Sequence, residues 1–171
     1  GEVAQGKGDA FLIKLDSKGR TLADTQFGTT GLDSVAAMAT GADGSLYVAS
    51  VQDGRAILAK YAGGDINSAP LWSQDIGALA PGGGIGGLAV DGNKIYLSGT
   101  TSNPALDAGG AATIAAAHGG GTEAFVFAFT DQGASASADR ITYVGTGASE
   151  QGGAVSVGPD GTVYLTGTTM G

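Results

Sequence analysis

The sequence contains no cysteine and one histidine, and only 14% of its residues are charged. Without cysteine the chain can form neither a disulfide nor a thiolate metal site. The single histidine, His118, has no second imidazole that could join it in a metal site or a catalytic triad. We therefore expect no metal and no other cofactor.

Basic residues are also few, because 8 lysines and arginines against 16 acidic residues give a net charge of −8. A nucleic-acid surface needs clustered lysine and arginine to displace counterions, and here these residues are scattered. An anionic membrane surface is disfavoured for the same reason. No apolar run approaches the roughly 20 residues of a membrane-spanning helix. We expect neither a nucleic-acid partner nor membrane insertion.

The sequence starts at Gly1 rather than at a methionine and contains no signal peptide. We therefore expect an excised or processed piece of a longer protein, in which a missing export signal carries no meaning. Its 171 residues are enough for one domain with a real core.

Glycine is abundant, with 33 residues, while 42% of the chain is hydrophobic. Each glycine inside a helix costs about 1 kcal/mol relative to alanine, whereas short strands joined by tight turns tolerate it. The hydrophobic residues fall in compact blocks, unlike those of disordered chains. This composition predicts an all-β fold.

Three sequence elements recur in the same order, which indicates a tandem repeat. They are a short apolar block that contains an alanine, an apolar residue followed by glycine, and an Asp-Gly turn followed by a tyrosine. The apolar residue lies 20 positions before the tyrosine in each unit, in the pairs Phe27 and Tyr47, Ile76 and Tyr96, and Val144 and Tyr164. The alanine lies 37, 40 and 40 positions before the same tyrosines, at Ala10, Ala56 and Ala124.

Each repeat unit predicts four short antiparallel strands. The units span residues 9–50, 55–101 and 123–169, and a long loop separates the last two at 102–122. The Asp-Gly turns at Asp43, Asp91 and Asp160 predict the hairpin between the third and fourth strands, because glycine adopts positive φ without steric cost.

Residue size along the strands favours a β-propeller. Small residues at 35–39 and 86–89 in the third strand suit a crowded central axis, where neighbouring blades converge. Phenylalanines suit the wider space between blades, as at Phe11, Phe125, Phe127 and Phe129. Four-stranded units around an axis are the propeller pattern. A parallel β-helix is the alternative, although its coils are shorter and lack antiparallel hairpins.

If the small-residue strand is innermost, the chain starts with the two outer strands of one blade. It continues through two complete blades and stops after the two inner strands of another. Residues 1–171 then form a single β-propeller region of about three blade equivalents. Because propellers close with about 4 to 8 blades, we expect part of a larger ring. A dimeric ring of six blades is the alternative, and open blade edges would permit self-association.

These residues resemble the SBBP-type β-propeller repeats of many bacterial surface and secreted proteins. The matching pieces are residues 8–16 (GDAFLIKLD), Phe27-Gly28 and residues 44–48 (GSLYV), with SGTT at 98–101 and TGTT at 166–169 closing the later units. The resemblance implies four-stranded antiparallel blades, an extracellular or cell-surface setting and no established catalytic residues. Two positions depart from the pattern, with Arg55 replacing an acidic residue and Ala128 replacing a lysine.

Residue types that form catalytic, metal or ligand sites in other proteins are all expected to have structural roles here. His118 is expected to face solvent, and the Asp-Gly turns lack the ligand spacing of a calcium loop. The glycines at 82–87 lack the ending of a phosphate loop and suit close backbone packing. Trp72 is expected to pack in the core or at a blade edge rather than to serve as a sugar platform. Residues 111–117 are expected to form one or two helical turns ended by Gly119, as a cover over a blade edge.

The sequence therefore favours a non-catalytic structural or interaction module of a bacterial cell-surface, appendage or secreted protein. Its expected partner is a protein, or further repeats of the same parent chain. A ligand-binding or glycan-binding propeller is the first alternative. The propeller of a secreted hydrolase or lyase is the second, although no cluster of acidic or basic residues marks its site.

Overall fold

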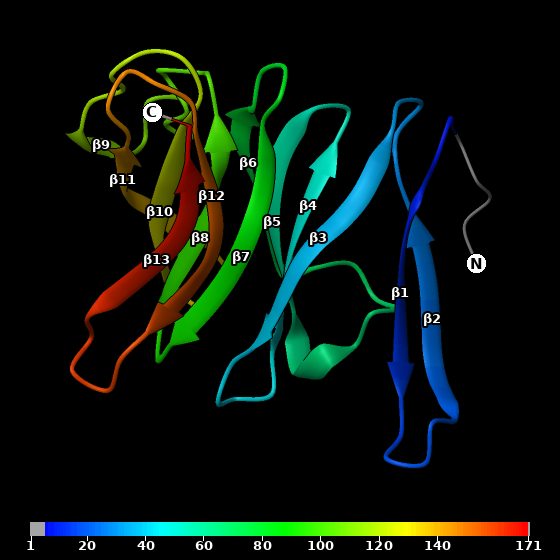
Figure 1. Ribbon diagram of the computed structural model, residues 1–171. Helices are drawn as coiled ribbons and strands as arrows, with labels where there is room; N and C mark the ends of the chain where they lie inside the picture. The colour runs from blue at the N-terminus through cyan, green and yellow to red at the C-terminus, as the bar shows by residue number, and fades with distance from the viewer. Residues whose placement is uncertain (1–5, 171) are drawn as a thin grey trace.

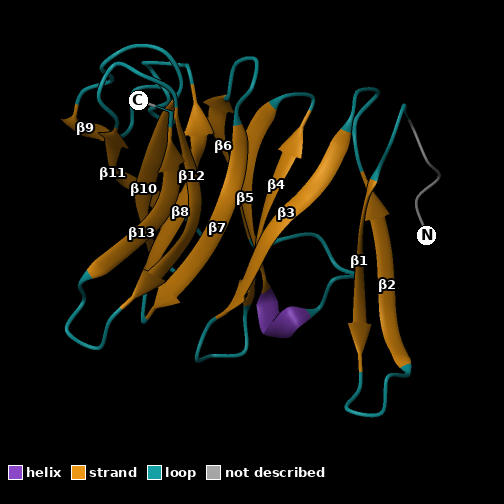
Figure 2. Ribbon diagram, viewed as in Figure 1, coloured by secondary structure: helices purple, strands orange, loops and turns teal. Residues whose placement is uncertain are grey.

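The computed structural model describes residues 6–170 and shows an all-β protein with no α-helix in that range (Figures 1 and 2). A single 3-10 turn lies at Ala62–Gly64. No helix within these residues has the length and apolar character that spanning a membrane requires. The all-β prediction is confirmed.

The strands form four sheets, each built from segments that are consecutive in the chain. The first sheet is β1–β2, the second is β3–β4–β5–β6, the third has the order β7–β8–β10–β11–β9, and the fourth is β12–β13. The strands are β1 (Ala10–Leu15), β2 (Thr21–Phe27), β3 (Asp33–Thr40), β4 (Leu46–Gln52), β5 (Arg55–Tyr61), β6 (Trp72–Ala78), β7 (Gly84–Asp91), β8 (Lys94–Thr101), β9 (Thr113–Ala116), β10 (Glu123–Asp131), β11 (Ala136–Val144), β12 (Glu150–Val157) and β13 (Val163–Thr169). Apart from β9, they divide into two, four, four and two, as the sequence predicts.

The sheets stand side by side, with β3 beside β7 and β7 beside β12 (Figure 1). Small residues permit this approach, because a Cβ added at Gly86 would lie 2.5 Å from the Gly153 oxygen. A Cβ added at Gly87 would lie 2.9 Å from the Val155 nitrogen. The expected close packing of the third strand is thus confirmed. The row of sheets does not close on itself within residues 6–170, and the propeller stays a prediction.

The Asp-Gly hairpins form where the sequence places them. Gly44 and Gly161 have φ values of 79° and 80°, which an L side chain rarely adopts. In these two turns an aspartate accepts the backbone N–H two residues later, Ser45 N–H to Asp43 and Thr162 N–H to Asp160, at 3.0 Å each. The turn between β7 and β8 is shorter, because Asp91 remains in its strand and pairs with Lys94.

The main hydrophobic core lies between the second and third sheets. Its fully buried side chains include Leu58, Ile76, Phe125, Phe127 and Phe129. A smaller core joins the first sheet to the second around residues such as Leu12, Val48 and Tyr61. Trp72 is buried, as expected.

Phe11 differs from the other phenylalanines, because it is 67% exposed rather than packed between sheets. It points away from the smaller core, on the face of β1 opposite the buried Leu12. The expected packing of Phe11 between sheets is therefore wrong for this chain by itself.

The long loop contains a strand and no helical turn, so the helical prediction for residues 111–117 is wrong. β9 pairs in parallel with β11 and sets Thr113 opposite Arg140. Gly109 and Gly110, with φ values of 74° and 85°, interrupt any helix before it. Leu106 is fully buried, and the Ala108 N–H bonds to the Ile76 oxygen at 3.0 Å. The segment therefore covers the outer edge of the third sheet.

Candidate functional site

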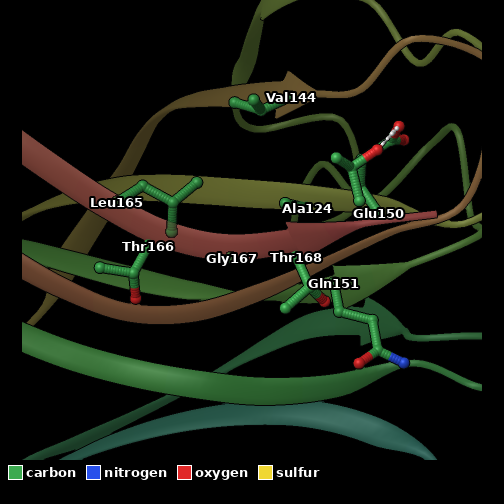
Figure 3. A pocket seen from close by; sticks show the side chains of 9 residues that line it. Ala124, Val144, Glu150, Gln151, Leu165, Thr166, Gly167 and Thr168 are labelled. Atoms are coloured by element: carbon green, nitrogen blue, oxygen red, sulfur yellow. Dashed lines mark hydrogen bonds between the residues drawn. The ribbon is translucent and has the colours of Figure 1, made fainter. Parts of the chain in front are cut away.

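A cavity of about 210 Å³ opens beside β13, between the third and fourth sheets (Figure 3). Val144 and Ala124 line it from the third sheet, Leu165 lines it from β13, and Glu150 and Gln151 lie at one end. A second cavity of about 350 Å³ adjoins it and shares Val144 and Leu165. We call the two together the β13 groove. Its third-sheet wall is made largely of small or short side chains.

The opposite end of the row of sheets is also apolar and open. One face of β1 exposes Phe11, Ile13 and Leu15. A cavity of about 260 Å³ lies beside β1, and Leu12, Met38, Leu46 and Ile66 contribute its apolar lining. We call this cavity the β1 groove and the three exposed side chains the β1 ridge. Both ends of the row of sheets thus expose apolar surface.

Two pairs of carboxylates in the described chain flank equivalent glycines, each directly after the end of a strand. A Cβ added at Gly28 would lie 2.8 Å from Asp33 Oδ2 and 3.0 Å from Asp9 Oδ1. A Cβ added at Gly145 would lie 2.6 Å from both Glu123 Cγ and Glu150 Oε2. Both glycines follow the second strand of their repeat units, so the two pairs occupy equivalent positions in the first and third units.

These carboxylates hold the crossovers that lead into the next strand. The backbone N–H of Thr29 donates to Asp33 Oδ2 at 2.6 Å, and its hydroxyl donates to the same carboxylate at 3.1 Å. The hydroxyl of Thr146 donates to Glu150 Oε1 at 2.9 Å. Thr169 donates to the same oxygen at 3.2 Å, which Figure 3 shows as a dashed line. The other oxygen of Glu150, Oε2, is buried and has no hydrogen-bond partner within residues 6–170.

The middle unit has no such pair. Arg55 occupies the position of Asp9 and Glu123, and its Nε donates to Asp75 Oδ2 at 2.8 Å. Gly77 takes the place of the flanked glycine, and there an added Cβ would meet Leu106 at 3.1 Å. The buried leucine of the long loop therefore stands where the other units place carboxylates.

His118 is not solvent-facing, so this prediction is wrong. Only 7% of its side chain is exposed, and its ring meets Tyr143 edge-on at 5.2 Å between centroids. Its Nδ1 accepts the Gly120 N–H at 3.1 Å and lies 3.8 Å from Glu123 Oε1. Its Nε2 is buried without a hydrogen-bond partner in the described chain. The Gly120 N–H and the Tyr143 ring hold the His118 side chain in place, and composition did not reveal these contacts.

A buried ion pair that the sequence did not predict joins the second and third sheets. Lys60 Nζ donates to Asp131 Oδ2 at 2.5 Å, and the side chains are 5% and 8% exposed. Tyr47 and Trp72 also donate to this carboxylate, at 2.7 and 3.1 Å. Burial acts to raise the pKa of Asp131, but the hydrogen bonds from Lys60 and Tyr47 outweigh it and hold that pKa below its ordinary value.

The polar groups of the described residues are largely used by the fold itself. No group of three or more histidine, aspartate or glutamate side chains within residues 6–170 is arranged to hold a metal ion. Ser98 donates to the Gly153 oxygen at 2.6 Å and so ties β8 to β12. Gly83 packs tightly, because an added Cβ would lie 2.8 Å from Leu79 Cβ. Two atoms are unpartnered within residues 6–170: His118 Nε2, which carries the ring proton when Nδ1 accepts, could donate one hydrogen bond, and Glu150 Oε2 could accept one.

Comparison with known proteins gives one partial similarity and no family. No family model matches the sequence. A stretch of 73 residues is 37% identical to part of the regulatory protein FlaEY of Caulobacter vibrioides. That stretch covers 43% of this chain but 7% of the relative, so the chain corresponds to a small part of that protein.

Proposed function

We propose that this chain is a segment of a β-propeller built from SBBP-type repeats and serves as a non-catalytic structural and interaction module. The strand grouping is the observation that carries the proposal. The first sheet, β1–β2, corresponds to the last two strands of the complete sheet β3–β4–β5–β6, and the fourth sheet, β12–β13, corresponds to its first two. Two complete sheets stand between them, with β3, β7 and β12 as neighbours. This order fits blades that succeed one another around an axis.

The distribution of polar and apolar groups supports an interaction role. The Lys60–Asp131 pair and the carboxylates of Asp33 and Glu150 bond to other parts of the same chain. The β1 ridge and the two grooves are open to solvent and largely apolar. Exposed apolar surface next to an unpaired strand favours association with another polypeptide.

The proposed setting is a bacterial surface, appendage or secreted protein. The resemblance to SBBP-type repeats and the cysteine-free, acidic composition support it. The similar stretch in FlaEY is a small part of a bacterial protein, and this supports a module within a larger chain.

Ligand or glycan binding is the second candidate, and one groove favours it. A cavity of about 820 Å³ lies between β2 and residues 66–70, with Asp24, Gln26, Asn67 and Ser68 in its lining. Amide, hydroxyl and carboxylate groups of this kind bond sugar hydroxyls. Glycan-array binding that Asn67→Ala abolishes, with folding retained, would favour this function.

An experimental structure of the chain at high concentration tests the architecture. We expect the sheets to fan around an axis near β3, β7 and β12. One continuous flat sheet or a linear solenoid would overturn the proposal. Incubation with a panel of polysaccharides and chromogenic esters tests the absence of catalysis. Turnover that Glu150→Gln removes without unfolding the protein would indicate the hydrolase or lyase alternative instead.

A further inference from the structure

We propose that β13 pairs with β1 of a second copy of this chain, in an antiparallel register that sets Tyr164 opposite Lys14. This inference rests on the proposed propeller segment and concerns residues 1–171 as a separate chain, in which a second copy supplies the strands that further repeats would supply in a longer protein. The fourth sheet of one copy and the first sheet of the other then form one four-stranded sheet, with the order β12–β13–β1–β2.

The register follows from the two complete sheets. In the second sheet, Tyr47 of β4 lies opposite Lys60 of β5. In the third sheet, Tyr96 of β8 lies opposite Ala128 of β10. Lys14, Lys60 and Ala128 each lie four positions after the alanine that begins the apolar block, and Tyr164 repeats Tyr47 and Tyr96. The same pairing therefore places Tyr164 opposite Lys14.

Both strands have an unpaired edge in the described chain. β13 pairs with β12, β1 pairs with β2, and the other edge of each strand has no neighbouring strand within residues 6–170. Such edges present unpaired N–H and C=O groups that another strand can use.

The β1 ridge matches the β13 groove in size. In the third sheet, Phe125, Phe127 and Phe129 occupy the repeat positions of Phe11, Ile13 and Leu15 and are fully buried against the second sheet. In the proposed pairing, the ridge would lie on the opposite face of the third sheet. That face carries Ala124, Val126 and Ala128, which are small enough to leave the groove open. Bulky side chains would thus enter a space with small walls.

Tyr164 matches the β1 groove in the same way. It is 59% exposed, whereas its counterpart Tyr47 is 2% exposed and packs between the second and third sheets. Pairing with β1 would lay Tyr164 over the β1 groove of the second copy, against Leu12, Met38 and Leu46. Each copy therefore offers one ridge, one tyrosine and the two grooves that would receive them.

Two copies are enough for closure. Each copy holds two complete sheets and two halves, and the reciprocal pairing of two copies gives six sheets. Six lies within the about 4 to 8 blades of closed propellers. The contact is head-to-tail, and a ring of two copies forms where the rotation from sheet to sheet brings the free strand of the second copy back to the first.

Disulfide trapping tests the register, because the chain has no cysteine of its own. Lys14→Cys is mixed with Tyr164→Cys under mild oxidation, and Lys14→Cys with Thr166→Cys is the matched control, two residues out of register. Opposed residues fall within the span of a disulfide, whereas residues two positions away lie about 7–8 Å apart. We expect the first mixture to give at least about 10-fold more cross-linked dimer. Equal yields, or more product from the control, would overturn the proposal.

Sedimentation velocity of the unmodified chain tests the assembly itself. We expect a dimer whose fraction rises with concentration, and at least about 10-fold weaker association in Phe11→Asp. Leu71→Asp is the matched control, because Leu71 is exposed and lines neither groove. A monomer at every concentration would overturn this inference. The propeller proposal would survive that result if the experimental structure still showed radial sheets.

Discussion

Lys60 of β5 and Asp131 at the end of β10 form a buried ion pair of 2.5 Å between two separate sheets. Tyr47 and Trp72, from the two strands adjacent to β5, bond to the same carboxylate. One aspartate of the third sheet thus contacts three strands of the second. This contact fixes how the two complete sheets sit against each other, and it depends on every member being present.

Removal of the Asp131 carboxylate should strongly destabilise the protein. Asp131→Ala leaves the buried ammonium of Lys60 without its counter-ion, and the loss of one partner of a buried pair costs about 3–5 kcal/mol. The free energy of unfolding in urea measures this. Asp75→Ala is the matched control, because the Arg55–Asp75 pair is about half exposed and should contribute about 1 kcal/mol or less. Equal losses in the two variants would contradict the structural role of the buried pair.

The same pair predicts a loss of stability in acid. Burial acts to raise the pKa of Asp131, but its hydrogen bonds lower that pKa by more than burial raises it. The folded-state pKa of Asp131 therefore lies below its unfolded value. The folded state then gains stability above about pH 3.9 and loses it as the pH falls through the lowered folded-state pKa. Urea unfolding between pH 7 and pH 2 measures this loss. Asp131→Asn should flatten the acid limb, and an unchanged limb would contradict this assignment.

Tyr47 predicts a corresponding effect in alkali. Burial, followed by the hydrogen bond to Asp131, raises the pKa of Tyr47 to about 12. Because the folded state holds this proton more tightly, its contribution to stability is lost as the pH rises from about 10 towards 12. Burial also raises the pKa of Tyr61 and Tyr143, so tyrosinate absorbance during an alkaline titration should show a late component that becomes smaller in Tyr47→Phe. If Tyr47→Phe instead removes an early component, the phenol is not buried against Asp131 in solution.

Local patterns predicted the strands and turns, whereas contacts between distant segments had no local signal. The Asp-Gly turns at Asp43 and Asp160 form because glycine and a side-chain acceptor specify them within a few residues. Asp131 also accepts the Gly133 N–H, which is a local bond of the same kind. Its bond to Lys60 spans 71 positions and depends on how two sheets stack. No periodicity within one unit reports such stacking.

In the long loop, local helix propensity also failed to predict the structure. Its alanine-rich stretch favours a helix in isolation, but β9 instead pairs with the exposed edge of β11. The expected exposure of His118 was wrong for the same reason, because a helical or open loop would have left its side chain in solvent. The burial of Leu106, and the bond from its N–H to the Tyr143 hydroxyl at 3.0 Å, fix the course of the segment. Tertiary contacts outweighed the local preference there.

A methyl group added at a carboxylate-flanked glycine should lower the stability of the protein. In Gly145→Ala the new Cβ would lie 2.6 Å from Glu123 Cγ and Glu150 Oε2, so two buried side chains would have to move. Overpacking of this kind costs about 1–3 kcal/mol. Gly84→Ala is the matched control, because it has no heavy atom within 4 Å of the added Cβ. It should be neutral or slightly stabilising, since alanine reduces the entropy of the unfolded chain. Urea unfolding of both variants decides the matter, and a Gly145→Ala protein as stable as Gly84→Ala would show that the carboxylates do not converge on this glycine.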